Sequence, residues 1–380
     1  MHDVALQNVT AFPPPTGPFG IGTVTYHWVD ANRPEVFSPD PHDRRELMVQ
    51  VWYPAHHVPG AERAPYLPQA DSVGPALARF LGMEDTAFGP LQDITTHAVV
   101  SAPVADEEPA YPVLIMLVGI KGSFRQLHTF QVEELVSHGY VVVALDQPYV
   151  EAVVVFPDGR EASYDERWDP PRRTFLYAHI PYVAGDVTFV LDQLAALGAD
   201  DAGTLSGRLD LDHVGLIGHS FGGVLGSEAC RVDLRLRAAL LEDAFMPTSV
   251  VDAGLTQPVM FITRDAESMR LERQVAGGWP ESDIHETIDT MRAVYEDLPG
   301  EGYFIEVPGM FHLDMTDAPL FSSFAPWPGF SGPIGGDRAH QIVNAYSLAF
   351  FDRSLRGRSA PLLEGPSPRF PEVHFESRRS

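Results

Sequence analysis

Two residue types are nearly missing from the sequence: Lys121 is its one lysine and Cys230 its one cysteine. A single cysteine excludes an internal disulfide and a cysteine-rich zinc site. No apolar run approaches the roughly 18 residues that a membrane-spanning helix needs, so no integral membrane association is expected. The segment after Met1 has no basic region followed by an apolar stretch. This favours a cytoplasmic location and leaves open a secreted form whose leader was removed.

Positive charge is also scarce. The chain has 26 Lys and Arg against 52 Asp and Glu, which gives a formal net charge of −26. Such a chain repels the phosphates of nucleic acids and the surface of anionic lipids, so no nucleic-acid partner is expected. Apolar material is plentiful, with 44% hydrophobic residues, which excludes global disorder.

Apolar runs of strand length alternate with helical patterns along the chain. The helical patterns cover 126–138, 181–197 and 337–356, the last starting at a capping Asp337. Strands are expected at 22–29, 46–53, 112–119, 140–146, 213–219, 238–243, 258–263 and 303–308. The alternation predicts an α/β fold with a mostly parallel eight-stranded sheet flanked by helices.

No internal repeat or low-complexity segment divides the chain, so we expect a single domain over 1–380. Within it, 1–45 form an N-terminal arm and the first strand, and 358–380 form a Pro-rich C-terminal tail. Residues 150–180 are expected to form part of a cap, or else a surface hairpin.

The clearest chemical motif is Gly218-His219-Ser220-Phe221-Gly222. It ends an apolar strand and precedes a helical segment, which is the setting of a nucleophile elbow. A serine hydroxyl is a weak nucleophile until a base takes its proton. His312 follows the last apolar run and is the expected base, because the other histidines after Ser220 lie in helical patterns or in the C-terminal tail.

Two aspartates compete for the role of the acid that orients the histidine. Asp243 follows the strand after the nucleophile strand, and Asp265 follows the next strand. A carboxylate at either place would fix the imidazole tautomer and stabilise the imidazolium. The sequence pattern alone leaves both open.

Three segments together resemble the plasma and type II intracellular platelet-activating factor acetylhydrolases and their bacterial relatives. The segments are 218–223 (GHSFGG), 241–247 (LEDAFMP) and 309–312 (GMFH). Weaker likeness extends over 16–22, 47–54, 123–125, 137–140 and 345–351. The resemblance implies an α/β-hydrolase fold. It also favours Asp243 as the acid, because in the family the acid lies about two dozen residues after the serine.

The resemblance also implies an oxyanion hole with two backbone amides. One belongs to Phe221, and the other to the loop 118–125 (VGIKGSFR), where the family has HGLGAFR. The loop here is one residue longer, so its second donor is Ile120 or, counted from the other end, Lys121. Four side chains are expected to line the substrate pocket: Lys121, Phe245, Phe311 and Trp327. The ammonium of Lys121 would attract an anionic group of the substrate or stabilise negative charge at the mouth of the site. The alternative is a lysine without a role on a solvated loop.

These features predict a serine carboxylic-ester hydrolase that needs no metal and no cofactor. The resemblance implies a small-molecule or lipid-like ester as substrate, with short acyl groups such as those of platelet-activating-factor-like phospholipids. The alternative enzyme is a general short-chain carboxylesterase or polyester hydrolase. The alternative of another class is an inactive binding protein with the same fold. The sequence does not give the oligomeric state.

Overall fold

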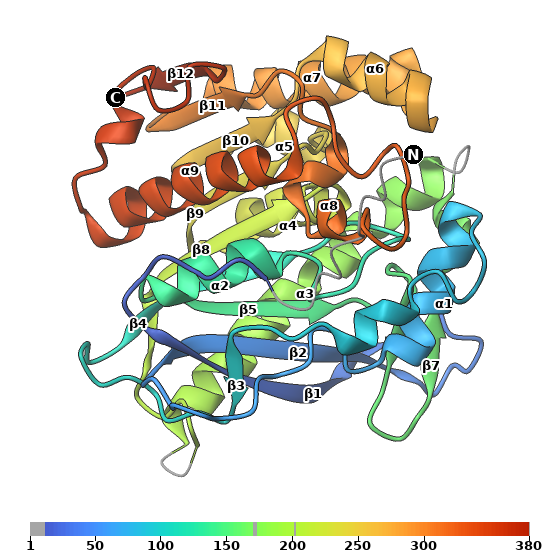
Figure 1. Cartoon of the computed structure of the whole chain (residues 1–380), viewed down its shortest axis with the longest axis vertical. Coiled ribbons are helices and arrows are strands. Elements are labelled where there is room, and N and C mark those ends of the chain that lie inside the picture. Colours follow the sequence, from blue (N-terminus) through green and yellow to red (C-terminus); the bar gives the residue numbers. More distant parts are fainter. Residues whose placement is uncertain (1–11, 170–172, 201–202, 380) are drawn as a thin grey trace, which may run out of the picture.

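The computed structural model describes residues 12–169, 173–200 and 203–379 (Figure 1). At its centre lies a ten-stranded sheet in the order β12-β11-β10-β9-β8-β4-β5-β2-β1-β3. Eight of these strands run in the same direction, whereas β2 and β12 run opposite to their neighbours. The strands are β1 (Gly20–Pro34), β2 (Arg44–Ala55), β3 (Ala98–Val100), β4 (Tyr111–Leu117), β5 (Val141–Asp146), β8 (Leu209–His219), β9 (Leu236–Glu242), β10 (Val259–Thr263), β11 (Gly302–Glu306) and β12 (His374–Arg378).

The eight predicted strands are all present, but the expected number was wrong because two edge strands join them. β3 and β12 have three and five residues, and most of their side chains are partly or fully exposed. An edge strand of this kind has no continuous apolar run to reveal it. The segment 358–380, expected to be a tail, therefore contributes β12 to the sheet; its last residue lies outside the described part.

Helices cover both faces of the sheet, as the apolar runs require. α2 (Thr129–Ser137) and α9 (Gly336–Arg356) lie side by side on one face (Figure 1). On the other face lie α3 (Arg173–Ala199), α4 (Phe221–Val232), α5 (Thr248–Ala253) and α7 (Glu281–Asp297), and α6 (Ala266–Ala276) packs beside α7. In β4, Val113, Ile115 and Leu117 face one apolar cluster, whereas Leu114 and Met116 face the other.

The boundaries of all three predicted helices differ from those expected, and α2 covers Thr129–Ser137 instead of 126–138. α3 begins at Arg173 and keeps Pro181 inside it, so it starts before the predicted residue. The N-cap of α9 is Gly335, and Asp337 lies in the first turn. An acidic side chain is favourable there because it meets the positive end of the helix dipole.

A third apolar cluster lies at the carboxyl-terminal edge of the sheet. It joins α1 (Ala70–Leu81), which the sequence pattern did not predict, to α8 (Ala318–Phe321) and the residues that follow it. Part of the expected cap is a short hairpin of β6 (Val153–Val155) and β7 (Glu161–Ser163). Val154 of this hairpin packs against Met48 of β2.

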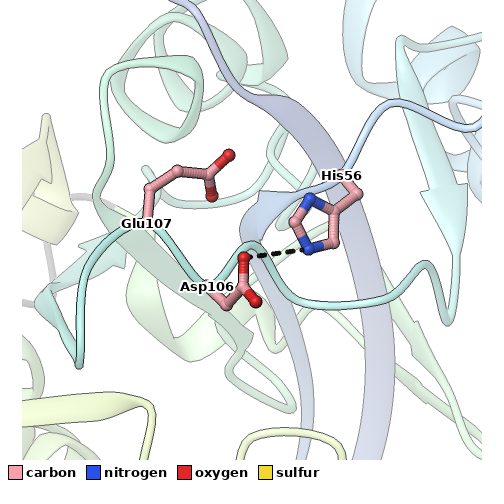
Figure 2. A group of neighbouring side chains, drawn as sticks. All are labelled: His56, Asp106 and Glu107. Carbon is pink, nitrogen blue, oxygen red and sulfur yellow. Dashed lines mark ion pairs between the residues drawn. The ribbon is translucent and has the colours of Figure 1, made fainter.

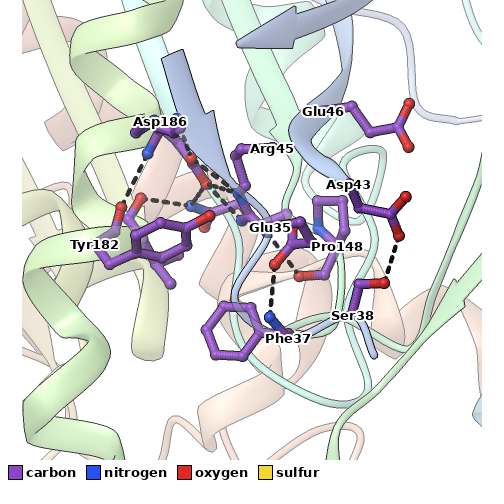
Figure 3. A network of polar contacts seen from close by, with 12 residues as sticks. Glu35, Phe37, Ser38, Asp43, Arg45, Glu46, Pro148, Tyr182 and Asp186 are labelled. Carbon is purple, nitrogen blue, oxygen red and sulfur yellow. Dashed lines mark hydrogen bonds and ion pairs between the residues drawn. The ribbon is translucent and has the colours of Figure 1, made fainter. Parts of the chain in front are cut away.

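A buried network of charges fixes α3 to the sheet (Figure 3). Arg45 of β2 is fully buried and donates to Asp186 of α3 (Nη2–Oδ2, 2.7 Å) and to Glu35 (Nη1–Oε2, 2.9 Å). Arg33 donates to the other oxygen of Asp186 at 2.7 Å. Burial alone would raise the pKa of Asp186, but the two guanidinium groups lower it. By length and composition, α3 is long and apolar enough to cross a membrane. In this fold, however, Asp186 of α3 lies in the buried charge network, and the apolar side of the helix packs in the protein core.

Replacing Asp186 by alanine is expected to lower the free energy of unfolding by about 3–5 kcal/mol, because Arg45 would keep its burial and lose a charged partner. Urea unfolding followed by circular dichroism measures this change. Asp158→Ala is the matched control, since its pair with Arg160 is exposed and such pairs contribute little. Equal losses in the two variants would contradict a special role for the buried network.

Candidate active site

The candidate site lies where the chain order in the sheet reverses. From β4 the chain moves to β5 on one side, and the later strand β8 lies on the other side. In open α/β sheets such a switch point leaves a crevice at the carboxyl ends of the strands. The loop that begins at Gly119 follows β4, and Ser220 follows β8, so both border this crevice.

Ser220 occupies the strained turn that the motif predicted. Its φ of 56° and ψ of −127° are unfavourable for any residue other than glycine. The turn is tight because small residues let strand and helix approach. A Cβ on Gly222 would lie 2.3 Å from the carbonyl oxygen of Leu117, and one on Gly218 would lie 2.5 Å from that of Gly222. A Cβ on Gly119 would lie 3.3 Å from the Cβ of Ser220, so this loop passes directly over the serine.

The structure brings His312 to Asp243. His312 Nδ1 lies 2.5 Å from Asp243 Oδ2, which is within hydrogen-bond distance. Burial lowers the pKa of His312 and Asp243 raises it, with a net shift downward. Burial alone would raise the pKa of Asp243, but Arg264 and His312 hold it below its ordinary value. The carboxylate is therefore ionised and the imidazole neutral at neutral pH, as a general base must be.

Asp265, the competing acid, lies elsewhere. Its side chain caps α6 by accepting a hydrogen bond from the amide of Ser268 at 2.8 Å. Asp243 instead accepts hydrogen bonds from the Thr263 hydroxyl (3.0 Å) and from Arg264 Nε (2.8 Å). Of the two aspartates, Asp243 is the one that contacts His312.

Backbone hydrogen bonds in the loop after β4 distinguish between Ile120 and Lys121 as the second candidate oxyanion donor. The amide of Lys121 donates to the carbonyl of Val150 at 2.9 Å and is therefore occupied. Within the described residues, the amide of Ile120 donates to no protein acceptor. Phe221 is the first residue of α4, and the first amides of a helix lack intrahelical acceptors.

A buried ion pair anchors this loop. The amide of Arg125 donates to Asp146 Oδ1 at 2.7 Å, and its guanidinium pairs with Oδ2 of the same carboxylate. Asp146 is the last residue of β5, next to β4 in the sheet. Ser123 adds a hydrogen bond to the carbonyl of Gly119 at 2.6 Å. The amides near Ser220 are thus held by the rigid sheet.

A cavity of about 560 Å³ opens beside Ser220 and His312. Its walls come from α1, the loop after β4, the segment 276–279 and the chain around α8. Seven aromatic side chains line it: Phe80, Phe88, Phe124, Trp279, Phe321, Trp327 and Phe330. The cavity is therefore mainly apolar, with its polar groups gathered around the serine.

Of the four side chains expected in the pocket, Lys121 and Trp327 line the cavity and the other two do not. Phe245 packs against Tyr177 of α3, with ring centroids 6.3 Å apart. Phe311 is buried in the protein core next to the backbone of Gly332. Phe245 lies close in sequence to Asp243 and Phe311 to His312, but neither side chain lines the cavity.

The charge of Lys121 is already paired. Its Nζ lies 2.9 and 3.1 Å from the two carboxylate oxygens of Asp169, and Tyr164 donates to the same carboxylate. The backbone of Lys121 has a φ of 68°, in the left-handed region. The side chain therefore shapes the rim of the cavity, and its ammonium has a protein counter-ion.

Three residues around the histidine were not identified from the sequence: Arg264, Glu272 and Trp279. Trp279 meets the His312 ring edge-on with centroids 4.9 Å apart, and it lies over the guanidinium of Arg264. Glu272 lies in α6, where nothing in the pattern distinguishes it from a surface residue. Arg264 carried a usable signal, because it directly follows a buried strand at the edge that holds the site.

One group of side chains has the composition of a metal site, but it lies at the opposite edge of the sheet. His56 Nε2 is 3.4 Å from Asp106 Oδ1, and Glu107 lies close to both (Figure 2). All three side chains are exposed. His56 follows β2, which runs opposite to β5, so the group is remote from Ser220.

The comparisons with known proteins define the class first: the fold is that of α/β-hydrolases, and the chain is a carboxylic ester hydrolase. The solved structure of a ferulic acid esterase from Streptomyces cinnamoneus superposes with a TM-score of 0.77 and 32% sequence identity. The match covers 97% of this chain and 99% of that one.

Sequence comparison then relates the chain to named proteins. Residues 4–161, less than half of the chain, match the family described as platelet-activating factor acetylhydrolase, isoform II. A probable 1-alkyl-2-acetylglycerophosphocholine esterase from Arthroderma benhamiae is 24% identical, over 96% of this chain and 93% of its own length. The platelet-activating factor acetylhydrolase of Canis lupus familiaris is 25% identical over 69% of this chain, which spans 61% of that protein.

Proposed function

We propose that the chain hydrolyses carboxylic esters through Ser220, His312 and Asp243, with an acyl-serine intermediate. The observation that carries this proposal is the 2.5 Å contact between His312 and Asp243 on the wall of the cavity that Ser220 also lines. A neutral imidazole backed by an ionised carboxylate is what a serine needs to become a nucleophile.

Each group has a defined part in the reaction. His312 Nε2 takes the proton of the Ser220 hydroxyl as its oxygen bonds to the ester carbonyl carbon, and Asp243 stabilises the imidazolium. The amides of Phe221 and Ile120 donate to the oxyanion of the tetrahedral intermediate. The imidazolium then protonates the leaving alcohol. Water, deprotonated by His312, then attacks the carbonyl carbon of the acyl-serine. The bond between this carbon and the Ser220 oxygen breaks, His312 returns the proton to that oxygen, and the acid is released.

The substrate we propose is an ester of an aromatic acid of the hydroxycinnamic type. Two observations support it: seven aromatic side chains line the cavity, and the structure 32% identical to this chain is a ferulic acid esterase. A planar aromatic acyl group packs well against such rings. The cavity is also walled by α1 and the chain around α8, which favours a small ester over a polymer.

A second candidate substrate is a short-acyl phospholipid of the platelet-activating-factor type. The names of the curated relatives favour it. An acetyl group would leave most of the 560 Å³ cavity unfilled, so this candidate predicts little benefit from the aromatic wall.

Trp327→Ala is expected to lower kcat/KM for methyl ferulate about tenfold, because an aromatic contact contributes roughly 0.5–1.5 kcal/mol beyond its buried area. Hydrolysis of p-nitrophenyl acetate should change much less. Steady-state rates on both esters, and on a phospholipid with an sn-2 acetyl group, measure the difference. Phe375→Ala, an aromatic change in β12 away from the cavity, is the control. Equal losses on acetate and ferulate would contradict the aromatic-acyl proposal and favour the short-acyl substrate.

A further inference from the structure

Arg264 contacts Asp243, the proposed acid of the site. It directly follows β10, its side chain is fully buried, and its Nε donates to Asp243 Oδ2 at 2.8 Å. This is the same oxygen that contacts His312 Nδ1. One carboxylate oxygen is therefore shared between a fixed cation and the imidazole.

Glu272 balances that cation. Its carboxylate pairs with the guanidinium of Arg264, and its Oε2 accepts a hydrogen bond from the backbone amide of His312 at 3.1 Å. Its side chain is also buried. The guanidinium lies over the ring of Trp279, with 4.6 Å between Arg264 Cζ and the ring centroid. The ring therefore limits the access of water on that side. In this surrounding of low polarity, each charge acts strongly on the others.

We propose that Arg264 and Glu272 are a matched pair of positioning residues that sets the proton affinity of His312. The pair adds no net charge. The groups next to His312 therefore carry a net charge of −1, which is the charge that Asp243 alone would provide. Arg264 acts through Asp243, and Glu272 acts through its contacts with Arg264 and the main chain of His312. This inference rests on the proposed role of His312 as the general base.

Three other titratable groups lie around His312. They are His219 at the end of β8, His128 before α2 and Asp314 in the turn that His312 begins. Burial lowers the pKa of both His219 and His128, so they are neutral near pH 7. The carboxylate of Asp314 accepts hydrogen bonds from the amides of Phe311 and Gly332 and from the Ser331 hydroxyl. Arg264 and Glu272 are in direct contact with the His312–Asp243 pair, and Asp314 acts on Arg264 through space and favours its charged form.

The signs of the expected changes are opposite for the two residues. Without Arg264, two negative charges stabilise the imidazolium, so the pKa of His312 rises and the acid limb of kcat/KM moves to higher pH. Without the charge of Glu272, the remaining charges cancel, so the pKa falls and the limb moves to lower pH. Each shift should be on the order of one pH unit.

The test is the pH dependence of kcat/KM between pH 4 and 9 for wild type, Arg264→Met, Glu272→Gln and the double variant. The single variants should shift the acid limb in opposite directions. The double variant restores the net charge and should return the limb to within a few tenths of a unit of wild type. Arg270→Met removes an exposed arginine of α6 and is the matched control, with no expected shift. Thermal unfolding of each variant measures its folded state separately.

A purely structural role would lower kcat or the melting temperature and leave the acid limb in place, and that result would overturn the inference. Shifts in the same direction for both single variants would also overturn it. If Arg264→Met does not fold, Glu272→Gln alone tests the proposal. An acid limb of kcat/KM at the wild-type pH in this variant would contradict it. Ser220→Ala separates the two levels: retained activity there refutes the proposed function, whereas activity lost there with unmoved limbs refutes this inference alone.

Discussion

Replacing Ser220 by alanine is expected to lower kcat for ester hydrolysis by a factor on the order of 10⁶, because the members of such a triad act as a unit. Alanine removes the oxygen that would bond to the carbonyl carbon and leaves the oxyanion amides in place. Binding should therefore persist, and KM should change by a much smaller factor. Hydrolysis of p-nitrophenyl acetate and methyl ferulate, corrected for the rate without enzyme, measures the loss.

Ser227→Ala is the matched control for this variant. Ser227 lies in α4, the helix that begins directly after Ser220. Its buried hydroxyl donates to the carbonyl of Val224 at 2.8 Å. It does not line the cavity, so its loss should leave kcat close to that of wild type. An alanine variant of Ser220 with wild-type kcat would show that another group performs the chemistry.

Asp243→Asn should lower kcat about 10⁴-fold, because an amide can hold the imidazole in the tautomer that is unable to accept the serine's proton. Asp265→Asn should have little effect on kcat. Asparagine caps a helix about as well as aspartate does, so the hydrogen bond to Ser268 is kept. The same assay on both variants, together with their melting temperatures, gives the comparison.

Comparable losses of kcat in the two variants would contradict the assignment of Asp243. A loss confined to Asp265→Asn would exchange the two roles. Asp243 also contacts Arg264, so the stability of Asp243→Asn must be measured beside its activity.

Much of the sheet could be predicted because burial on both faces leaves a record in the sequence. The runs that form β4 and β5 are continuously apolar, since each side chain faces either the α3 and α4 side or the α2 and α9 side. Ser220 could be placed as well, because the elbow needs glycines at fixed offsets. These signals are local and survive without knowledge of the fold.

The walls of the cavity could not be predicted in the same way. α1 contains Pro75 within the helix. Its segment also lies outside the alternating pattern of strands and helices from which the other elements were predicted. Phe245 and Phe311 were expected in the pocket from their closeness to Asp243 and His312 in the chain. Which way a side chain points in a loop depends on tertiary packing, and that information is spread over distant segments.

The charges around His312 illustrate the same limit. Arg264 and Asp265 are neighbours in the sequence, yet one contacts Asp243 and the other caps α6. Glu272 reaches the same point from the second turn of α6. Only the fold shows that these side chains, from separate elements, meet at one histidine.

The central claim is that His312 and Asp243 activate Ser220, and covalent labelling with a fluorophosphonate probe tests it most directly. We expect the wild-type protein to gain one adduct, located by peptide mass spectrometry on the peptide that contains Ser220. Ser220→Ala should gain none, and Asp243→Asn should react far more slowly. An unlabelled wild-type protein, or equal labelling of Ser220→Ala, would contradict the account.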